Sequence, residues 1–437
     1  MRKVFRFCIY SLAICCLLMS CNKDKEETGK EAIPPEKLPV VMVHGFLASG
    51  DTYEQQMLRF ASNGYPLDLL YTYEWNSLDV GGDSQADLEK FINEVLVKTG
   101  KTQVDLVGHS AGSNLVYKFC STNWRAEKVR SVVLLAGFVQ PGPAGTEKIK
   151  IPTLNIFSPY DKIVASSGPI AGAKNLNLSL KDHYQVATCT ETFEAMFQFF
   201  TGSKPATMEI IAQENPTISG KVLSFGENLS GVGAALQVFE VSPATGLRLR
   251  STPDFALTVN EKNEWGPIQI KTGAFYEFRV TTGKAGDRPV HYYREPFKRD
   301  NKNVVIRSFP PSGSLASLFL TSLPMDDGQA VHAFFGASQA VISGRDELRV
   351  NNISLANDKF AAAANTTIAL FMYDANNDQA TDETAISAFS LFPFLAGVDI
   401  YFPATEGAGS RFEYNGRVLN VRNWPSATEG VSVAVFD

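Results

Sequence analysis

Cysteine is scarce in this sequence once its first 21 residues are set aside. Of the six cysteines, four lie in that opening stretch, and only Cys120 and Cys189 follow it. A framework of several disulfides, of the kind that stabilises small secreted domains, is therefore excluded. Cys120 and Cys189 are compatible with one disulfide in an oxidising compartment and equally with two buried free thiols.

Long clusters of lysine and arginine are also missing. The formal net charge is −6 at pH 7, and an acidic chain without a basic patch is not expected to bind nucleic acid. Apolar residues, in contrast, fill 44% of the 437 positions. This length and apolar content predict two or three domains, each with its own core.

The apolar run at the N-terminus is too short to cross a bilayer comfortably. It extends from Phe7 to Met19 and follows basic residues, which predicts an export signal over residues 1–20. The signal ends in Leu-Met-Ser-Cys21, which resembles the lipobox of bacterial lipoproteins. This resemblance implies cleavage before Cys21 and lipidation of that cysteine, and a plain cleavable signal is the alternative.

Residues 21–38 are polar, charged and then proline-containing, without apolar periodicity. Such a composition predicts a tether. The charges that follow Cys21 are similar to the surface-export signal of lipoproteins in some Gram-negative bacteria, although a solvated linker has the same composition. We therefore expect an exported lipoprotein of the cell envelope, held at the outer membrane through Cys21, with display on the cell surface left open.

Strand and helix patterns alternate between residues 39 and 202. Segments whose apolar residues have helical spacing, such as 51–63 and 83–98, lie between short apolar runs that are typical of buried strands. These runs lie at 38–43, 69–73, 103–109, 129–135 and 151–158. The alternation predicts a three-layer α/β domain with a parallel sheet, whose site lies at the carboxyl ends of the strands.

The third of these runs leads into Gly108-His109-Ser110-Ala111-Gly112, and a helical pattern follows. A G-x-S-x-G motif between a strand and a helix is typical of a nucleophile elbow, a tight turn that lifts a serine hydroxyl above the sheet. Small neighbours are required because the turn is so sharp. The motif predicts Ser110 as a catalytic nucleophile.

A second motif, His44-Gly45-Phe46, follows the first buried strand. In acyl-transfer enzymes with this arrangement, one oxyanion-hole N–H comes from that loop and the other from the residue after the nucleophile. We therefore expect the backbone N–H groups of Phe46 and Ala111 to form the oxyanion hole.

The nucleophile needs a general base and a group that orients this base. Of the five histidines, His183 is the candidate base because it follows Ser110 in the chain, lies in a loop and precedes a helical pattern. The others lie in the motifs above or far downstream: His44, His109, His291 and His332.

Asp161 is the candidate orienting acid, since it comes just after the strand at 151–158. The order serine, aspartate, histidine is the one expected for this fold. Asp182 and Asp105 are the competing acids. Asp182 is disfavoured because neighbouring side chains on a loop rarely face each other, and Asp105 because it precedes the serine.

Together these motifs resemble those of an α/β-hydrolase of the lipase/esterase kind. Residues 59–66, 191–207 and 293–301 are further similar to segments of a two-domain lipase from a hyperthermophilic archaeon. This resemblance implies an N-terminal catalytic domain, a C-terminal β domain that helps to bind a lipid-like substrate, and no cofactor.

One departure concerns the lid. Those lipases carry a helical lid insertion before the elbow, whereas residues 71–85 connect the two elements directly here. A lid shields an apolar acyl groove and moves to admit substrate. Its absence predicts an uncovered groove and a preference for short acyl chains.

From residue 203 onward, short alternating runs separated by turn residues predict β-sandwich-like structure. We expect a catalytic domain at 39–202, a β domain at 203–283 and a second at 284–437, or a single β domain at 203–437. The runs expected to form strands in the last part include 303–309, 315–320, 331–335 and 366–373.

A calcium loop is superficially suggested by Asp374, Asn376, Asp378 and Asp382. The glutamate that closes such a twelve-residue loop is replaced by Ala385. We interpret the segment as a solvated turn and expect no metal site.

The sequence thus predicts a monomeric serine carboxylic-ester hydrolase that forms an acyl-enzyme with a small-molecule or lipid ester. Within enzymes, a polyester, peptide or amide substrate is the alternative. From another class, the alternative is a surface lipoprotein that binds lipid or glycan with an inactive hydrolase domain.

Overall fold

The computed structural model describes residues 36–79, 81–284 and 287–437. The predicted export signal, Cys21 and the tether up to residue 35 lie outside the described residues. Among the helices that are described, none is long and apolar enough to cross a membrane.

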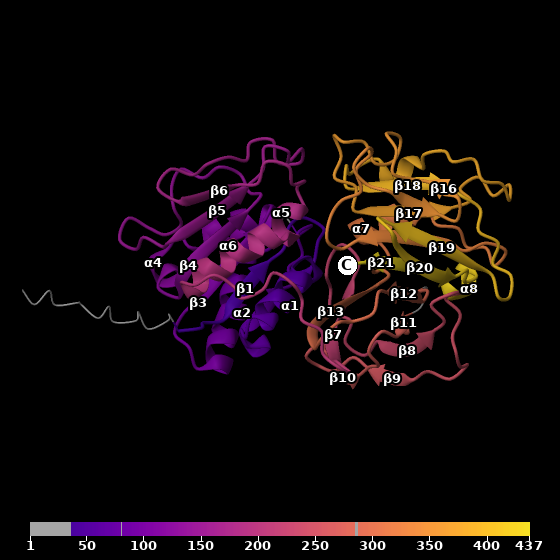
Figure 1. Cartoon of the computed structure of the whole chain (residues 1–437), viewed down its shortest axis with the longest axis horizontal. Helices are drawn as coiled ribbons and strands as arrows, with labels where there is room; N and C mark the ends of the chain where they lie inside the picture. Colours follow the sequence, from indigo (N-terminus) through magenta and orange to yellow (C-terminus); the bar gives the residue numbers. More distant parts are fainter. Residues whose placement is uncertain (1–35, 80, 285–286) are drawn as a thin grey trace, which may run out of the picture. The chain divides into compact units, whose positions relative to one another are not determined.

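A six-stranded sheet, in the order β2-β1-β3-β4-β5-β6, forms the centre of residues 40–201 (Figure 1). All of its strand pairs are parallel. The strands are β1 (Val40–Val43), β2 (Leu70–Tyr73), β3 (Val104–His109), β4 (Val129–Leu135), β5 (Thr153–Phe157) and β6 (Lys174–Asn177). The central strands are buried nearly throughout, which explains their continuous apolar runs.

Helices cover both faces of this sheet. They are α1 (Glu54–Ser62), α2 (Ser84–Thr99), α3 (Ala111–Phe119), α4 (Asn123–Ala126), α5 (Gln185–Thr188) and α6 (Thr190–Thr201), with 3₁₀ turns η1 (Gly50–Tyr53) and η2 (Leu67–Leu69). Along β1, Val40 and Met42 share a core with α1 and α6, whereas Val41 and Val43 share one with α2 and α3. This alternation follows from the two-residue period of a strand. The predicted three-layer α/β architecture is confirmed.

The rest of the described chain is mainly β structure in three sheets. Eight strands follow the order β18-β17-β14-β21-β12-β11-β8-β9, and the smaller sheets are β10-β7-β13 and β16-β15-β19-β20. The strands are β7 (Thr217–Ser224), β8 (Ala235–Val241), β9 (Phe255–Thr258), β10 (Trp265–Gln269), β11 (Phe275–Thr281), β12 (Val290–Arg294), β13 (Asn301–Ser308), β14 (Val331–Gly336), β15 (Leu348–Val350), β16 (Ile353–Ser354), β17 (Ala369–Tyr373), β18 (Leu395–Asp399), β19 (Gly409–Tyr414), β20 (Arg417–Arg422) and β21 (Val431–Phe436). Because β11 pairs with β12, segments on both sides of residue 284 contribute to the eight-stranded sheet.

The prediction of a strand at residues 315–320 is wrong, because these residues form the helix α7 (Leu315–Leu320). Ser314 caps this helix: its side chain accepts a hydrogen bond from the Ser317 N–H at 3.1 Å. An N-terminal serine cap and good helix formers such as leucine and alanine favour the helix over the extended form. The remaining short helices are η3 (Ser387–Phe389) and α8 (Ser426–Glu429).

We call the region around the six-stranded sheet the α/β part and the region with the three later sheets the β part. The two belong to one compact unit, residues 35–437. Buried polar contacts join them. Glu54 of α1 accepts hydrogen bonds from Arg294 of β12 at 2.9 Å and from Asn301 of β13 at 2.6 Å. Such buried pairs hold two surfaces in one register, since separating them would leave a carboxylate in an apolar interior.

Candidate active site

Ser110 lies at the turn between β3 and α3, with a φ of 54° and a ψ of −120°. This backbone conformation is strained for a residue other than glycine. Only glycine fits at two neighbouring positions: a Cβ on Gly108 would lie 2.5 Å from the Gly112 carbonyl oxygen, and one on Gly112 would lie 2.3 Å from that of Val43. The strand, sharp turn and helix predicted from the motif are confirmed.

His183 and Asp161 are brought together across 22 residues of sequence. The Nδ1 atom of His183 lies 2.7 Å from Oδ2 of Asp161, and both side chains are buried. The other carboxylate oxygen accepts hydrogen bonds from the N–H groups of Ile163 and Val164 at 2.8 and 3.0 Å. Burial favours a higher pKa for Asp161, but the hydrogen bonds from His183 and from these two N–H groups lower it below its usual value. The carboxylate is therefore ionised and fixed in place.

The two competing acids have other partners. Asp182 accepts hydrogen bonds from the backbone N–H groups of Tyr184 and Gln185 and pairs with Arg345. Asp105 pairs with Arg130 and accepts from the Ser131 hydroxyl. In the part of the chain that the structure describes, Asp161 is thus the acid that contacts the His183 ring.

The other four histidines are buried and bonded elsewhere. The ring of His109 contacts the His183 carbonyl oxygen through Nε2 at 3.0 Å. Burial, together with the nearby His183, lowers the pKa of His109 to about 3, so the ring is neutral at pH 7 and its Nε2–H donates to that carbonyl. His44, His291 and His332 contact Gly45, Glu277 and Asn423 respectively. The support that His109 gives to His183 was not predicted, because the motif marks this position only as variable.

The loop that carries Phe46 passes directly over the serine. A Cβ on Gly45 would lie 3.0 Å from the Cβ of Ser110. The loop is held by hydrogen bonds from the Leu47 N–H to the Ser77 hydroxyl at 2.8 Å and from the Ala48 N–H to the Gly45 carbonyl at 3.4 Å. Ala111 is the first residue of α3, and the first N–H groups of a helix have no acceptor within it. Both predicted donors therefore belong to segments that meet at Ser110.

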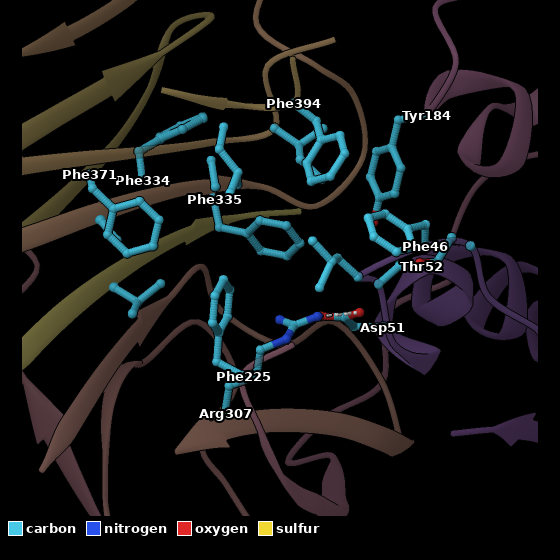
Figure 2. Close-up of a pocket in the computed structure, with 18 of the residues that line it drawn as sticks. Phe46, Asp51, Thr52, Tyr184, Phe225, Arg307, Phe334, Phe335, Phe371 and Phe394 are labelled. Atoms are coloured by element: carbon cyan, nitrogen blue, oxygen red, sulfur yellow. Dashed lines mark hydrogen bonds and ion pairs between the residues drawn. The ribbon is translucent and has the colours of Figure 1, made fainter. Parts of the chain in front are cut away.

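Ser110, His109 and His183 line one cavity of about 210 Å³ together with apolar side chains. Figure 2 shows Phe46, Tyr184, Phe335, Phe394 and Phe371 around it. Its polar members include Asp51 and Arg307, which are joined by a dashed line in the figure. A space of this composition suits an apolar ligand.

This cavity corrects the expectation of an uncovered groove. The β part supplies its cover, with residues from the end of β7 to β21: Phe225, Val290, Phe309, Leu323, Phe335, Phe371, Leu395 and Val431 are among them. Phe46 itself packs against Phe392 and Phe394, with ring centroids 5.8 and 6.5 Å apart. In the described residues between β2 and α2 there is no inserted helix, and distant segments of the β part line the cavity instead.

Among the described residues, no group of three or more His, Cys, Asp or Glu side chains could hold a metal ion. The loop that suggested calcium uses its acidic groups within the turn. Both oxygens of Asp374 accept backbone N–H groups, those of Asp378 and Gln379, at 3.3 and 2.7 Å. Cys120 and Cys189 are free thiols.

Comparison with protein families gives three matches. Residues 37–128 match the family described as lipase (class 2), residues 214–311 match the lipase C-terminal domain, and residues 334–437 match a further C-terminal domain family. The first match includes the Phe46 loop and the Ser110 turn, and the second covers the strands β7 to β13.

Solved structures with similarity include lipase BlEst2 from Bacillus licheniformis, at 14% identity and a TM-score of 0.31, over 38% of this chain and 93% of that one. Lipase B from Aspergillus fumigatus has 16% identity and a TM-score of 0.30, over 39% and 54%. A bromoperoxidase from Bacillus anthracis has 17% identity and a TM-score of 0.28, over 38% and 92%.

The closer resemblance to an archaeal two-domain lipase stays a prediction. The parallel sheet with its serine turn has the α/β-hydrolase fold, residues 37–128 match the class 2 lipase family, and residues 214–311 match the lipase C-terminal domain.

Proposed function

We propose that the protein is a serine carboxylic-ester hydrolase that acts through an acyl-enzyme, with Ser110, His183 and Asp161 as its catalytic triad. The observation that carries the proposal is the 2.7 Å contact between His183 Nδ1 and Asp161 Oδ2, on a histidine that lines the same apolar cavity as Ser110. A nucleophile, a base and an orienting acid are the parts that acyl transfer by serine requires.

In the first half of the reaction, the Ser110 Oγ attacks the ester carbonyl carbon while His183 Nε2 takes the hydroxyl proton. Asp161 accepts the Nδ1–H, which keeps the ring in the tautomer with a free Nε2 and stabilises the imidazolium that forms. The N–H groups of Phe46 and Ala111 donate to the developing oxyanion. The alcohol then leaves with the proton from His183.

In the second half, water attacks the acyl-Ser110 carbonyl, and His183 takes a proton from this water. Collapse of the second tetrahedral intermediate returns the proton to Ser110 and releases the carboxylic acid. The overall change is one ester and one water to one acid and one alcohol. No cofactor is needed for it.

The acyl group would occupy the apolar cavity. Burial of one methylene group contributes up to about 0.8 kcal/mol, or nearly fourfold in kcat/KM where the contact is complete in the transition state. The apolar walls supplied by the β part therefore favour medium or long acyl chains, contrary to the short-chain preference expected from the sequence. A panel of p-nitrophenyl esters from acetate upward tests this, and a steady fall in kcat/KM from acetate onward would contradict it.

Labelling with a fluorophosphonate probe tests the serine chemistry itself. We expect stoichiometric labelling of the wild type and none of Ser110→Ala. Equal labelling of both proteins would refute the assignment, because the reactive residue would then lie elsewhere. Labelling of neither would refute it and favour a binding protein with an inactive hydrolase domain. Matched ester and anilide substrates then separate an esterase from an amidase, because an esterase leaves the anilide almost untouched.

We also propose that the mature protein is a lipoprotein anchored through Cys21. The support is the lipobox-like sequence before that residue. Fractionation of cells expressing the wild type and Cys21→Ser tests it: the wild type is expected in the membrane fraction and the variant outside it. Recovery of both in the membrane would contradict the anchor.

A further inference from the structure

The turn that follows His183 is held from the β part by one segment, residues 338–346. Asp182, which immediately precedes His183, is 2% exposed. One of its oxygens accepts from the N–H groups of Tyr184 and Gln185 at 2.9 and 2.8 Å, and the other receives Arg345 Nη1 at 2.7 Å. The carboxylate thus links the backbone on either side of His183 to the β part.

Arg345 is itself fixed by its own segment. Its Nε donates to Asp346 at 2.9 Å, and its Nη2 donates to the Ala340 carbonyl at 2.5 Å. Asp346 is held in turn, since it accepts from the Ile342 N–H at 2.8 Å. Because the guanidinium is planar and bound on several sides, it presents Nη1 to Asp182 in one orientation.

Two more contacts from the same segment reach this turn. Gln185 Nε2 donates to Gln339 Oε1 at 3.1 Å, and the Thr188 hydroxyl donates to the Ser338 carbonyl. Gln185 also accepts from Arg345 Nη1 at 3.0 Å. The contacts are therefore spread along residues 182–188, and Arg345 makes two of them.

His183 has two further supports, both from the α/β part. Asp161 fixes the ring through Nδ1, and His109 binds the main-chain carbonyl. The segment between β6 and α5 that carries His183 belongs to no strand of the sheet. Its third support, through Asp182, comes from the β part.

We propose that Arg345 is a positioning residue for His183, so that the β part completes the catalytic geometry as well as covering the cavity. The proposal rests on the proposed triad. Its chemical reason is that loss of Arg345 leaves the buried Asp182 carboxylate without its counter-charge. The carboxylate then draws in water or a proton, its two backbone hydrogen bonds loosen, and His183 moves relative to Ser110.

The alternative is that Arg345 only stabilises the fold. The two roles differ in kinetics: a displaced base lowers kcat and the rate of serine labelling in the folded protein, whereas a purely structural contact changes neither. A misplacement of about 1 Å at a reacting group costs about a hundredfold in rate.

The test compares Arg345→Ala, Arg345→Lys and the control Arg349→Ala by kcat, KM and the rate of fluorophosphonate labelling. Arg349 lies in β15, and its partner Glu347 is exposed like Arg349 itself. We expect Arg345→Ala to lower kcat and the labelling rate by ten- to a hundredfold with KM within about twofold, Arg345→Lys to recover part of this loss, and Arg349→Ala to match the wild type.

A folded Arg345→Ala that labels and turns over like the wild type would overturn the proposal. If Arg345→Ala does not fold, Arg345→Lys and Asp182→Asn decide in the same assays, because each retains hydrogen bonding at the site, and wild-type rates in both would overturn it. Failure of the triad itself is a separate result, since it shows as absent labelling of the wild type.

Discussion

Arg307 of β13 and Asp51 of η1 form a buried ion pair across the two parts of the molecule, with Nη2 2.7 Å from Oδ2. The same guanidinium nitrogen donates to the Ser49 hydroxyl at 2.6 Å. Both charged residues also line the cavity. The pair therefore joins the β part to the segment that follows the Phe46 loop.

The first prediction concerns this pair. Arg307→Met leaves the Asp51 carboxylate buried without its counter-charge, and removal of one partner of a buried pair costs about 3–5 kcal/mol. Urea unfolding should show a free energy of unfolding lower by that amount. Lys302→Ala is the matched control, because Lys302 of the same strand pairs with Asp68 at the surface. An exposed pair contributes less than about 1 kcal/mol, and equal losses in the two variants would contradict the argument.

The second prediction concerns the length of the cavity. Ala333 of β14 lies opposite Phe371 of β17, and both line the cavity. In Figure 2, Phe371 lies on the side of the cavity opposite to Phe46. Ala333→Phe should fill this end and lower kcat/KM at least tenfold for long-chain esters, while short-chain esters are hydrolysed at nearly the wild-type rate.

The reverse variant at this end is Phe371→Ala, which removes a wall and should extend the accepted chain length. It also leaves a void that costs about 3–5 kcal/mol of stability, so the assays require a temperature well below unfolding. For each variant, the kcat/KM for long-chain esters is to be divided by that for short-chain esters. If this ratio is the same as in the wild type for both variants, the acyl chain lies elsewhere.

The serine turn could be predicted because its determinants are local. Gly108 and Gly112 are required by close approach within one turn and to the neighbouring strand β1, and such a requirement leaves a short motif in the sequence. The alternation of strands and helices is local in the same sense. Asp161 is preferred over Asp182 on the sequence because neighbouring side chains on a loop rarely face each other. In the structure, Asp182 turns its carboxylate to the backbone and to Arg345.

The cavity cover could not be predicted, because it depends on contacts between residues far apart in the chain. Phe225 and Phe371 lie 115 and 261 positions after Ser110, and nothing in their own neighbourhoods marks them as cavity walls rather than core. The same holds for β21, which lies between β12 and β14 and pairs parallel with both. Alternating runs predict strands but not which remote strands pair.

The third prediction concerns the loop above the serine. In Gly45→Ala, the added methyl group would lie 3.0 Å from Ser110 Cβ and 3.3 Å from His109 Nδ1. The loop must therefore shift by a few tenths of an ångström, which displaces the Phe46 N–H that we propose as an oxyanion donor. We expect kcat to fall by about 10²–10³, the cost of losing one oxyanion donor. Gly142→Ala serves as the control, since a Cβ there meets nothing within 4 Å, and its kcat should be unchanged.

The last prediction concerns acid stability through His332 of β14. This ring is fully buried, lies edge-on to Phe402 with centroids 4.6 Å apart, and binds Asn423 Oδ1 through Nε2 at 2.9 Å. Burial lowers the pKa of His332 to about 4, against about 6.5 in an unfolded chain. Because the unfolded state takes up the proton first, the contribution of this residue to stability is present above pH 6.5 and is lost as the pH falls towards 4.

The size of this loss is on the order of 3 kcal/mol, from a pKa difference of about 2.5 units at 1.36 kcal/mol each. His332→Gln retains a donor near the Nε2 position but cannot titrate. Compared with the wild type by urea unfolding, the variant should be less stable at pH 7.5 and should lose less stability between pH 7.5 and pH 4.5. Parallel stability curves for the two proteins over this range would show that His332 does not take up a proton on unfolding, and the acid sensitivity would then have to come from other groups.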